Sequence, residues 1–535
     1  MKDRPHDDGA APTGPDGAAR RRKDAPPGAP GAAARASGVS LASAFLDLWD
    51  RNQSELARHG PSALTDRAAA AAAEAAAAKR PKAAPKAAPP PALTVAAVTP
   101  PPFCDPEPAP SPMPAPDDIA PHRRGRPSPL VFHLAAAAAS SAQAAGMAPL
   151  AADPRFPWTR SNAVRGAALG EALAEHGALG ASALVSHASL RDLTRMLDGI
   201  AAWQRHPWRR DIAEPPTIWR RGAARILDYG ATDAAGRDGP PVLVIPSLVN
   251  RGYVLDLHPR RSMLRWLAAQ GLRPLLLDWG QPGMAERDFT LSDYVRLRLA
   301  PALEAARMHS PDGSAPALVG YCMGGTLAAA VASAGRDRVS RLALIGSPWD
   351  FSAMQGIGGA LIGLAKTEDR VTAGLRLDAI GSAFGALPVD ALQLAFATLD
   401  PTLASRKFRA LAAMDQGGPR AEMFAATEDW LNDGVTLAIP AAKELLFDWY
   451  LDNAVGRGVW APEGAPVRPR AIAAPTLAFC SNNDRIAPSA CAEALPLAIP
   501  RAQVLRPSTG HVGMIIGSEA ERQVWRPLAS FLGAQ

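Results

Sequence analysis

The chain has 535 residues, of which 47% are hydrophobic, and it carries a formal net charge of +6. This length suffices for one large domain with additions. The lysines and arginines are scattered and no nucleic-acid-reading motif accompanies them, so we expect no nucleic-acid partner. Four cysteines with neither paired nor metal-ligand spacing argue against a disulfide framework and against a metal site, and they favour a reducing, cytoplasmic location.

The first quarter of the chain has a low-complexity composition. Alanine, proline, glycine and charged residues dominate residues 1–125, which predicts a mostly disordered extension without a secretory signal. Residues 40–58 are an exception, because their apolar side chains recur at helical spacing and predict one amphipathic helix. Such a helix would dock on the catalytic domain, on a partner or on an apolar granule surface, or it would fray. Its apolar residues are Leu41, Phe45, Leu48, Trp49 and Leu56.

Residues 126–222 are predicted to be a helical region, with the clearest helix over Ser189–Trp203. The alanine-rich stretch Val131–Ala152 is a candidate for a membrane span. Polar residues and a proline interrupt it, including His133 and Pro149, and its hydrophobicity is low. We therefore expect a packed helix and no membrane span.

Residues 223–535 alternate short apolar runs with helical stretches, which predicts an α/β fold whose mostly parallel sheet has helices on both faces. A long insertion at about residues 349–470 interrupts this rhythm and is expected to form a helical cap over the site, or an extra helical layer. Its aromatic side chains favour a substrate that is not strongly polar; they are Trp349, Phe351, Phe384, Trp430, Phe447, Trp449 and Tyr450. The expected strands are Arg225–Tyr229, Val242–Pro246, Arg273–Asp278, Ala315–Val319, Arg341–Gly346, Pro475–Cys480 and Gln503–Arg506.

The sequence from Gly320 to Gly325, Gly-Tyr-Cys-Met-Gly-Gly, follows an apolar run and precedes an alanine-rich helical stretch. This pattern is typical of a nucleophile elbow, in which flanking glycines permit the sharp turn that presents the central side chain. The central side chain here is the Cys322 thiol. The motif alone is equally compatible with a cysteine buried for packing, so other residues must decide.

An acid and a histidine follow Cys322 in the order that an α/β-hydrolase triad requires. Asp484 closes an apolar strand, and His511 lies in Ser-Thr-Gly-His-Val-Gly. Asp484 would orient the His511 ring, which would take the proton of the Cys322 thiol. The oxyanion needs two backbone donors, for which we expect the N–H of Met323 and the N–H of Val249.

A cysteine nucleophile indicates the kind of reaction. A thiol that displaces a thiol conserves the energy of the acyl group, so Cys322 favours transfer from a coenzyme A thioester to an alcohol over ester hydrolysis. Thioesterases and some depolymerases also use cysteine, so hydrolysis stays open. The other three cysteines have packing interpretations: Cys480 in the core, Cys491 on a helix face and Cys104 in the disordered extension.

Four segments together resemble the polyhydroxyalkanoate synthases. They are Ile245–Leu257, Leu277–Gly280, Gly320–Thr326 and Asp484–Pro488. The resemblance covers about residues 225–535, and its most specific part is the run Pro-x-x-x-Asn-x-x-Tyr-x-Leu-Asp-Leu that begins at Pro246. The segment that contains Trp430 and Asp433 also resembles the one that precedes the acid strand in that family.

The resemblance implies an α/β-hydrolase fold and an acyltransferase that polymerises (R)-3-hydroxyacyl-CoA into polyester. Cys322 would hold the growing chain as a thioester, His511 would deprotonate the thiol, and Asp484 would help to activate the hydroxyl of the next unit. Coenzyme A would leave as product, with no metal or redox cofactor. The implied partners are a polyester granule surface and either a second copy of the chain or a second synthase subunit.

The segment after His511, Val-Gly-Met-Ile-Ile-Gly, resembles the shorter, two-subunit synthases, which lack a tail like residues 1–125. Two other functions stay open. One is a cysteine-type hydrolase, either a thioesterase or an intracellular polyester depolymerase. The other is a granule-associated binding protein that uses the helix at residues 40–58 and has a silent catalytic site.

Overall fold

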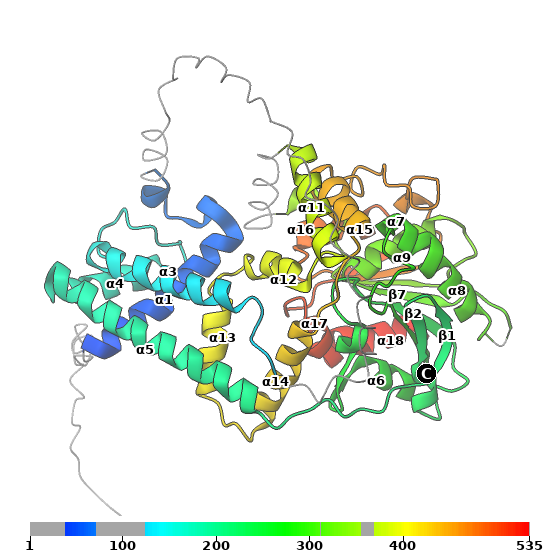
Figure 1. Cartoon of the computed structure of the whole chain (residues 1–535), viewed down its shortest axis with the longest axis horizontal. Coiled ribbons are helices and arrows are strands. Elements are labelled where there is room, and N and C mark those ends of the chain that lie inside the picture. The colour runs from blue at the N-terminus through cyan, green and yellow to red at the C-terminus, as the bar shows by residue number, and fades with distance from the viewer. Residues whose placement is uncertain (1–37, 71–123, 311, 355–368, 534–535) are drawn as a thin grey trace, which may run out of the picture.

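The computed structural model describes residues 38–70, 124–310, 312–354 and 369–533 (Figure 1). An α/β body built around a sheet forms one side of the molecule, and the N-terminal helices form a separate group on the other side (Figure 1). Two helices of the long insertion, α13 (Leu403–Ala412) and α14 (Pro419–Asn432), lie between the two groups.

Eight strands within the described ranges form one sheet in the order β1-β2-β6-β3-β7-β8-β9-β10. The six strands from β6 to β10 in this order are parallel to one another, whereas β2 pairs antiparallel with both β1 and β6. Every residue of β3, β7 and β8 is buried, as expected where helices cover both faces of a parallel sheet. The main strands are β1 Thr217–Arg221, β2 Ala224–Asp228, β3 Pro241–Ile245, β6 Arg273–Asp278, β7 Ala317–Tyr321, β8 Leu342–Ile345, β9 Thr476–Phe479 and β10 Ala502–Leu505.

The expectation of a helical region up to residue 222 is wrong at its end. The last N-terminal helix, α5 (Gly177–Arg205), stops well before that point, and β1 then pairs with β2 at the edge of the sheet. None of the side chains of β1 is fully buried, and Arg220 and Arg221 are among them. An exposed edge strand of this kind lacks the apolar alternation by which a strand is recognised in a sequence.

Helices cover the sheet and fix its parallel strands. The helix α9 packs against β7 and β8, α16 packs against β9 and β10, α6 packs against β6, and α8 packs against β3. The parallel strands therefore end at one edge, which is where such sheets carry their sites. The bounds of these helices are α6 Met263–Ala269, α8 Ala300–Arg307, α9 Met323–Ser333 and α16 Ser489–Leu497, and the last helix is α18 Arg526–Leu532.

The insertion between β8 and β9 is helical, and only part of it lies near the sheet. Its helix α13 packs against α5 of the N-terminal group. The two helices approach closely at Gly199, where an added Cβ would lie 1.9 Å from the carbonyl oxygen of Phe408. The insertion thus also braces the N-terminal helices, which the interpretation as a cap did not foresee. Its other helices are α11 Arg370–Phe384, α12 Val389–Ala397 and α15 Ile439–Lys443.

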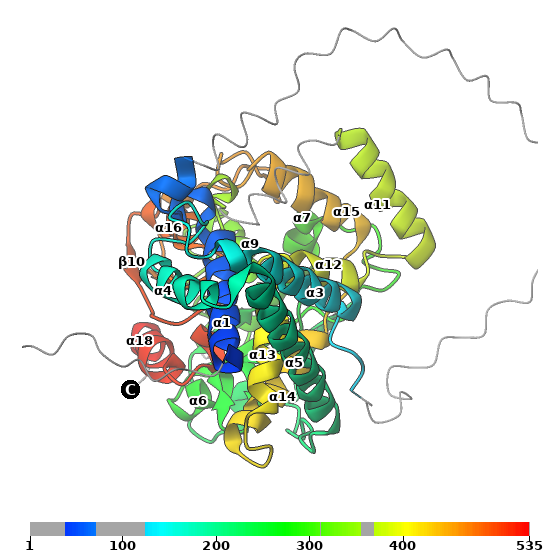
Figure 2. The ribbon, with the colours of Figure 1, turned by 90° about the vertical axis from the view of Figure 1, so that its left-hand side faces the viewer.

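The amphipathic helix of the N-terminal extension, α1 (Gly38–His59), docks on its own chain. Its apolar side chains Leu41, Phe45, Leu48 and Trp49 are buried in a cluster with residues of α3, α4 and α5. Figure 2 shows α1 among these helices. Residues 1–37 and 71–123, which are expected to be disordered, lie outside the described residues. The other helices of this group are α3 Leu130–Met147 and α4 Ala163–Ala174.

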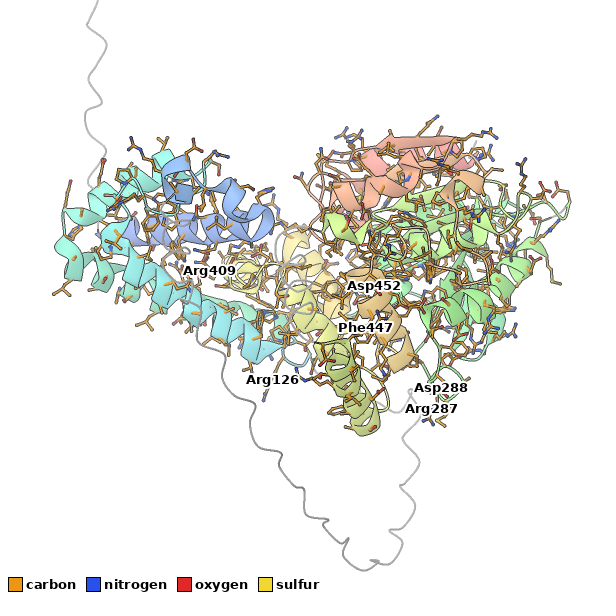
Figure 3. All side chains as sticks on the ribbon, turned by 90° about the horizontal axis from the view of Figure 1, so that it is seen from above. Arg126, Arg287, Asp288, Arg409, Phe447 and Asp452 are labelled. Carbon is orange, nitrogen blue, oxygen red and sulfur yellow. The ribbon has the colours of Figure 1, made fainter. Side chains whose placement is uncertain are left out.

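Ion pairs reinforce the contact of α1 with the insertion. The Arg409 guanidinium lies where α13 meets the N-terminal helices (Figure 3) and contacts Asp50 of α1 at 2.7 Å and Asp192 of α5. Burial, more than any neighbouring charge, raises the pKa of Asp50 to about 6, and Arg409 opposes that rise. One arginine therefore ties together three segments that are far apart in the sequence.

One helical stretch in the described part of the chain, Leu130–Leu150, is long and apolar enough to cross a membrane by length and composition, with a mean hydropathy of 1.2. In the structure it packs against α1 and α5. Its Ser140 accepts a hydrogen bond from Trp49, and the carbonyl of Ala145 accepts one from Ser182.

Truncation of Phe45 tests how firmly α1 is docked. Phe45 is fully buried, so Phe45→Ala should destabilise the N-terminal helices by about 3 to 5 kcal/mol. Hydrogen exchange of the α1 amides and thermal unfolding measure the effect. Leu190→Ala, on an α5 side chain that is 65% exposed, is the control and should stay within about 0.5 kcal/mol of the parent chain. Equal exchange in both variants would contradict the docking of α1.

Candidate active site

Cys322 occupies a sharp turn between β7 and α9. Its backbone has φ 56° and ψ −132°, a combination that a non-glycine residue adopts only where its surroundings enforce it. Glycines make the turn possible: a Cβ on Gly320 would lie 2.3 Å from Gly325 Cα, and one on Gly324 would lie 2.0 Å from the carbonyl oxygen of Ile245. The residue types around Cys322 therefore produce the geometry of a nucleophile elbow.

The structure brings the predicted acid and histidine together beside Cys322. Asp484 follows β9 and His511 follows β10, so the carboxyl ends of neighbouring parallel strands deliver both residues. Asp484 Oδ2 lies 2.6 Å from His511 Nδ1. Asp484 Oδ1 accepts the N–H groups of Ile486 and Ala487, each at 2.8 Å. The carboxylate is thus held on both sides, and its side chain has no exposed surface.

The His511 ring is buried between charged and aromatic groups. It stacks on the Tyr321 ring with centroids 5.0 Å apart, and it interacts electrostatically with the Cys322 side chain. Burial lowers the pKa of His511, but the charges of Asp484 and Cys322 outweigh burial and raise that pKa above its usual value. An imidazolium is therefore stabilised beside the Cys322 sulfur.

The two predicted oxyanion donors lie on either side of Cys322 in the fold. Met323 is the first residue of α9, so its N–H belongs to the unpaired amides of a helix N-terminus. Val249 lies in the loop after β3, and its N–H donates a long hydrogen bond of 3.4 Å to Ser247 Oγ. Pro246 at the start of that loop is fixed, because its carbonyl accepts the Trp279 indole N–H at 3.0 Å.

A cavity of about 550 Å³ opens over Cys322 and His511, a size typical of small-molecule sites. Sequence reasoning found the nucleophile, the histidine and the loop after β3, but it missed the part of the wall that the N-terminal region contributes. Ser128 and His133 belong to that part, and neither residue lies in a recognisable sequence motif. Other lining residues are Val249, Asn250, Tyr321, Gln393, Phe396, Leu399, Asp400, Leu403, Arg406, Lys407, Glu428, Trp430, Asn483 and Arg485.

The aromatic residues of the insertion do not line the cavity as a group. Of the seven named from the sequence, Trp430 alone is a lining residue. Trp349, Phe351 and Trp449 are buried in the core, and Phe384 is exposed on α11. The inference from these aromatic side chains to an apolar substrate therefore fails, although aliphatic residues of the insertion do make part of the cavity wall apolar.

The other described cysteines have packing environments. Cys480 and Cys491 are buried, and burial raises the pKa of each thiol to about 12. Cys322, in contrast, interacts electrostatically with His511. Cys104 lies outside the described residues. Within the described ranges, no group of three or more His, Cys, Asp or Glu side chains is placed to hold a metal ion.

Residues 240–518 match the family model of the alpha/beta hydrolase fold. The chain is 28% identical over 311 residues to a poly(3-hydroxyalkanoate) polymerase subunit PhaC from Haloferax mediterranei, a match that covers 58% of this chain and 61% of that protein. It is 28% identical over 334 residues to the PhaC subunit of Haloarcula marismortui, with coverages of 60% and 68%. The match to the Haloferax protein thus spans less than two thirds of its length.

Among solved structures, an alpha/beta hydrolase fold protein from Nakamurella multipartita is 19% identical with a TM-score of 0.33, over 55% of this chain and 93% of that one.

Alkylation separates the three described cysteines. At pH 8, iodoacetamide should modify Cys322 faster than Cys480 and Cys491, because a thiol with a pKa near 12 has a thiolate fraction lower by on the order of 10³ than an ordinary thiol. Peptide mass spectrometry over time gives a rate for each site. Modification of Cys480 or Cys491 at the rate of Cys322 would contradict the assignment of Cys322 as the activated thiol.

Replacement of Asp484 tests the source of the raised pKa of His511. In Asp484→Asn the charge that stabilises the imidazolium is lost, so the His511 pKa should fall and the ring should lose its proton at lower pH than in the parent chain. A nitrogen NMR titration of the histidines measures this. Asp378→Asn, which removes an exposed carboxylate paired with Lys443, is the control. An unchanged His511 pKa in Asp484→Asn would show that Asp484 is not the stabilising charge.

Proposed function

The chain belongs to the α/β-hydrolase fold family, and from this premise we propose that it is a polyhydroxyalkanoate polymerase that joins (R)-3-hydroxyacyl units from coenzyme A thioesters. The observation that carries the proposal is a cysteine at the strained elbow, which shares the cavity with a histidine that a buried carboxylate holds. Similarity to named polymerase subunits supports the choice of acyl donor.

In the first half of the proposed reaction, the Cys322 thiolate attacks the carbonyl carbon of the thioester. A carbon–sulfur bond forms to Cys322, and the negative charge moves to the carbonyl oxygen, within reach of the Met323 and Val249 amides. When the tetrahedral intermediate collapses, the coenzyme A sulfur leaves and takes the proton of the His511 imidazolium. The products are an acyl group on Cys322, free coenzyme A and a neutral His511.

In the second half, neutral His511 accepts the proton of the hydroxyl of another hydroxyacyl unit. The hydroxyl oxygen attacks the acyl carbon, an ester bond forms, and Cys322 leaves as a thiolate beside the regenerated imidazolium. Asp484 acts through His511 in both halves, because its side chain is unexposed and both of its oxygens are occupied. In this proposal the substrate hydroxyl therefore contacts His511. The family resemblance implies instead that Asp484 helps to activate that hydroxyl directly.

The cavity suits transfer to an alcohol. Aliphatic side chains of the insertion such as Leu399 and Leu403 form part of its wall and reduce the access of water to the acyl group. The proposal places the protein in the cytoplasm at a polyester granule surface, as a homodimer or with a second subunit, and it requires no metal or redox cofactor. Hydrolysis by the same triad is the competing outcome, in which water takes the place of the hydroxyl.

An assay with (R)-3-hydroxybutyryl-CoA tests the proposal. Free coenzyme A is followed with a thiol reagent, and the acyl product is recovered and divided into soluble and insoluble fractions. We expect coenzyme A release together with insoluble polyester, and loss of both in Cys322→Ala. Cys491→Ala is the matched control, because it removes a buried thiol outside the triad and should retain activity. Release of coenzyme A with only soluble hydroxybutyrate would replace the polymerase with a hydrolase.

A further inference from the structure

The loop that carries Val249, residues Ser247–Arg251, is held by a segment of the insertion. This clamp segment, Trp430–Val435, consists of the last turn of α14 and the three residues after it, and it runs beside the loop. Nearly two hundred residues of sequence separate the two, so the contact is purely tertiary. The contact is more than apolar packing, because it combines backbone pairing, an indole hydrogen bond and a carboxylate.

The backbone contacts fix the loop in the middle. Asn250 and Gly434 form an antiparallel bridge, and the Val435 N–H donates to the carbonyl of Val249 at 3.4 Å. Gly434 leaves little freedom on its far side, since an added Cβ would lie 2.5 Å from Val389 Cγ1 of α12. The clamp segment is therefore wedged between the insertion and the loop.

The side chains of the clamp segment hold the same loop farther along. The indole N–H of Trp430, a residue only 2% exposed, donates to the carbonyl of Arg251 at 2.8 Å. Asp433 accepts the Arg251 Nε–H at 2.8 Å. These bonds hold Arg251, at the end of the loop, by both its backbone carbonyl and its side chain.

The position of Val249 depends on these restraints. Its own N–H is engaged only by the long bond to Ser247 Oγ, within the same loop. The carbonyl of Val249 and that of Arg251 are both directed to the clamp segment. If the clamp segment moved away, the loop would keep its anchor at Pro246 but would lose the bonds that fix the Val249 peptide.

We propose that Trp430 and Asp433 are positioning residues that hold the loop Ser247–Arg251 where the Val249 N–H can stabilise the oxyanion formed at Cys322. The role rests on the proposed acyl transfer at Cys322, but not on which acyl group is transferred. It gives the insertion a direct effect on the rate of acylation, in addition to its effect on the shape of the cavity.

Two reactions of the same thiol separate this role from a general loss of structure. Acylation by p-nitrophenyl butyrate forms the Cys322 thioester, releases p-nitrophenolate and passes through an oxyanion. Alkylation by iodoacetamide forms a carbon–sulfur bond, releases iodide and forms no oxyanion. Both reactions need the Cys322 thiolate. The ratio of their rates therefore reports the oxyanion donors and cancels changes in thiolate content, and it requires no polymer.

In Trp430→Phe and Asp433→Asn, we expect the acylation rate to fall about 10- to 100-fold and the Cys322 alkylation rate to stay within about twofold. Trp158→Phe is the control for Trp430, since it removes a similarly buried indole hydrogen bond to a carbonyl in the N-terminal helices. Asp448→Asn is the control for Asp433, since Asp448 is 43% exposed against 45% and also pairs with an arginine. Both controls should keep the parent ratio.

A ratio within twofold of the parent value in both clamp variants would overturn the proposal, whether or not the separate rates fall. Failure of the polymer assay with a lowered ratio in these variants would leave the positioning role standing and remove only the polymerase. The two proposals are therefore tested independently.

Discussion

The strained backbone of Cys322 is the constraint on which the rest of the site depends. Its φ of 56° exists only because β7 lies beside β3 in a register that puts Gly320 next to Ile245, and because Gly324 lets α9 start against the end of β3. This arrangement fixes the sulfur and the Met323 amide on one rigid unit. The other groups, Val249, Asp484 and His511, arrive on loops, so their positions must be set by contacts outside the sheet.

Those contacts come largely from carboxylates that hold loops from distant segments. Asp484 holds His511, and Asp433 holds the loop after β3. Asp400, in the insertion, accepts bonds from Arg485, the neighbour of Asp484, from Arg406 of α13 and from Ser54 of α1. Because Asp400 is buried, loss of one partner would leave a charge poorly compensated. The docked N-terminal helix is thereby connected to the loop that bears the acid.

The sequence was most informative where local chemistry decides the structure. The apolar strand runs, the glycines around Cys322 and the chain order of Asp484 and His511 predicted the sheet, the elbow and the meeting of the triad residues. It was least informative where tertiary contacts decide. The edge strand β1 carries arginines in place of an apolar pattern, α13 packs on α5 away from the sheet, and His133 reaches the cavity from a helix with no motif. The hydrogen bond from the Trp430 indole to the Arg251 carbonyl likewise cannot be predicted from hydrophobic periodicity.

The contrast between the rigid elbow and the walls supplied by distant segments also bears on the proposed choice of acyl group. The side of the cavity that contains Cys322 cannot adapt, because any shift there would disturb the strained elbow. The insertion supplies other residues of the cavity wall. None of the side chains of its helix α12 is fully buried. Gln393 and Phe396 of α12 line the cavity and are only partly buried. In the proposed reaction, differences in acyl length would therefore fall on the side of the cavity that α12 lines, and an apolar wall of this kind distinguishes acyl groups by only roughly 1 to 3 kcal/mol per methylene.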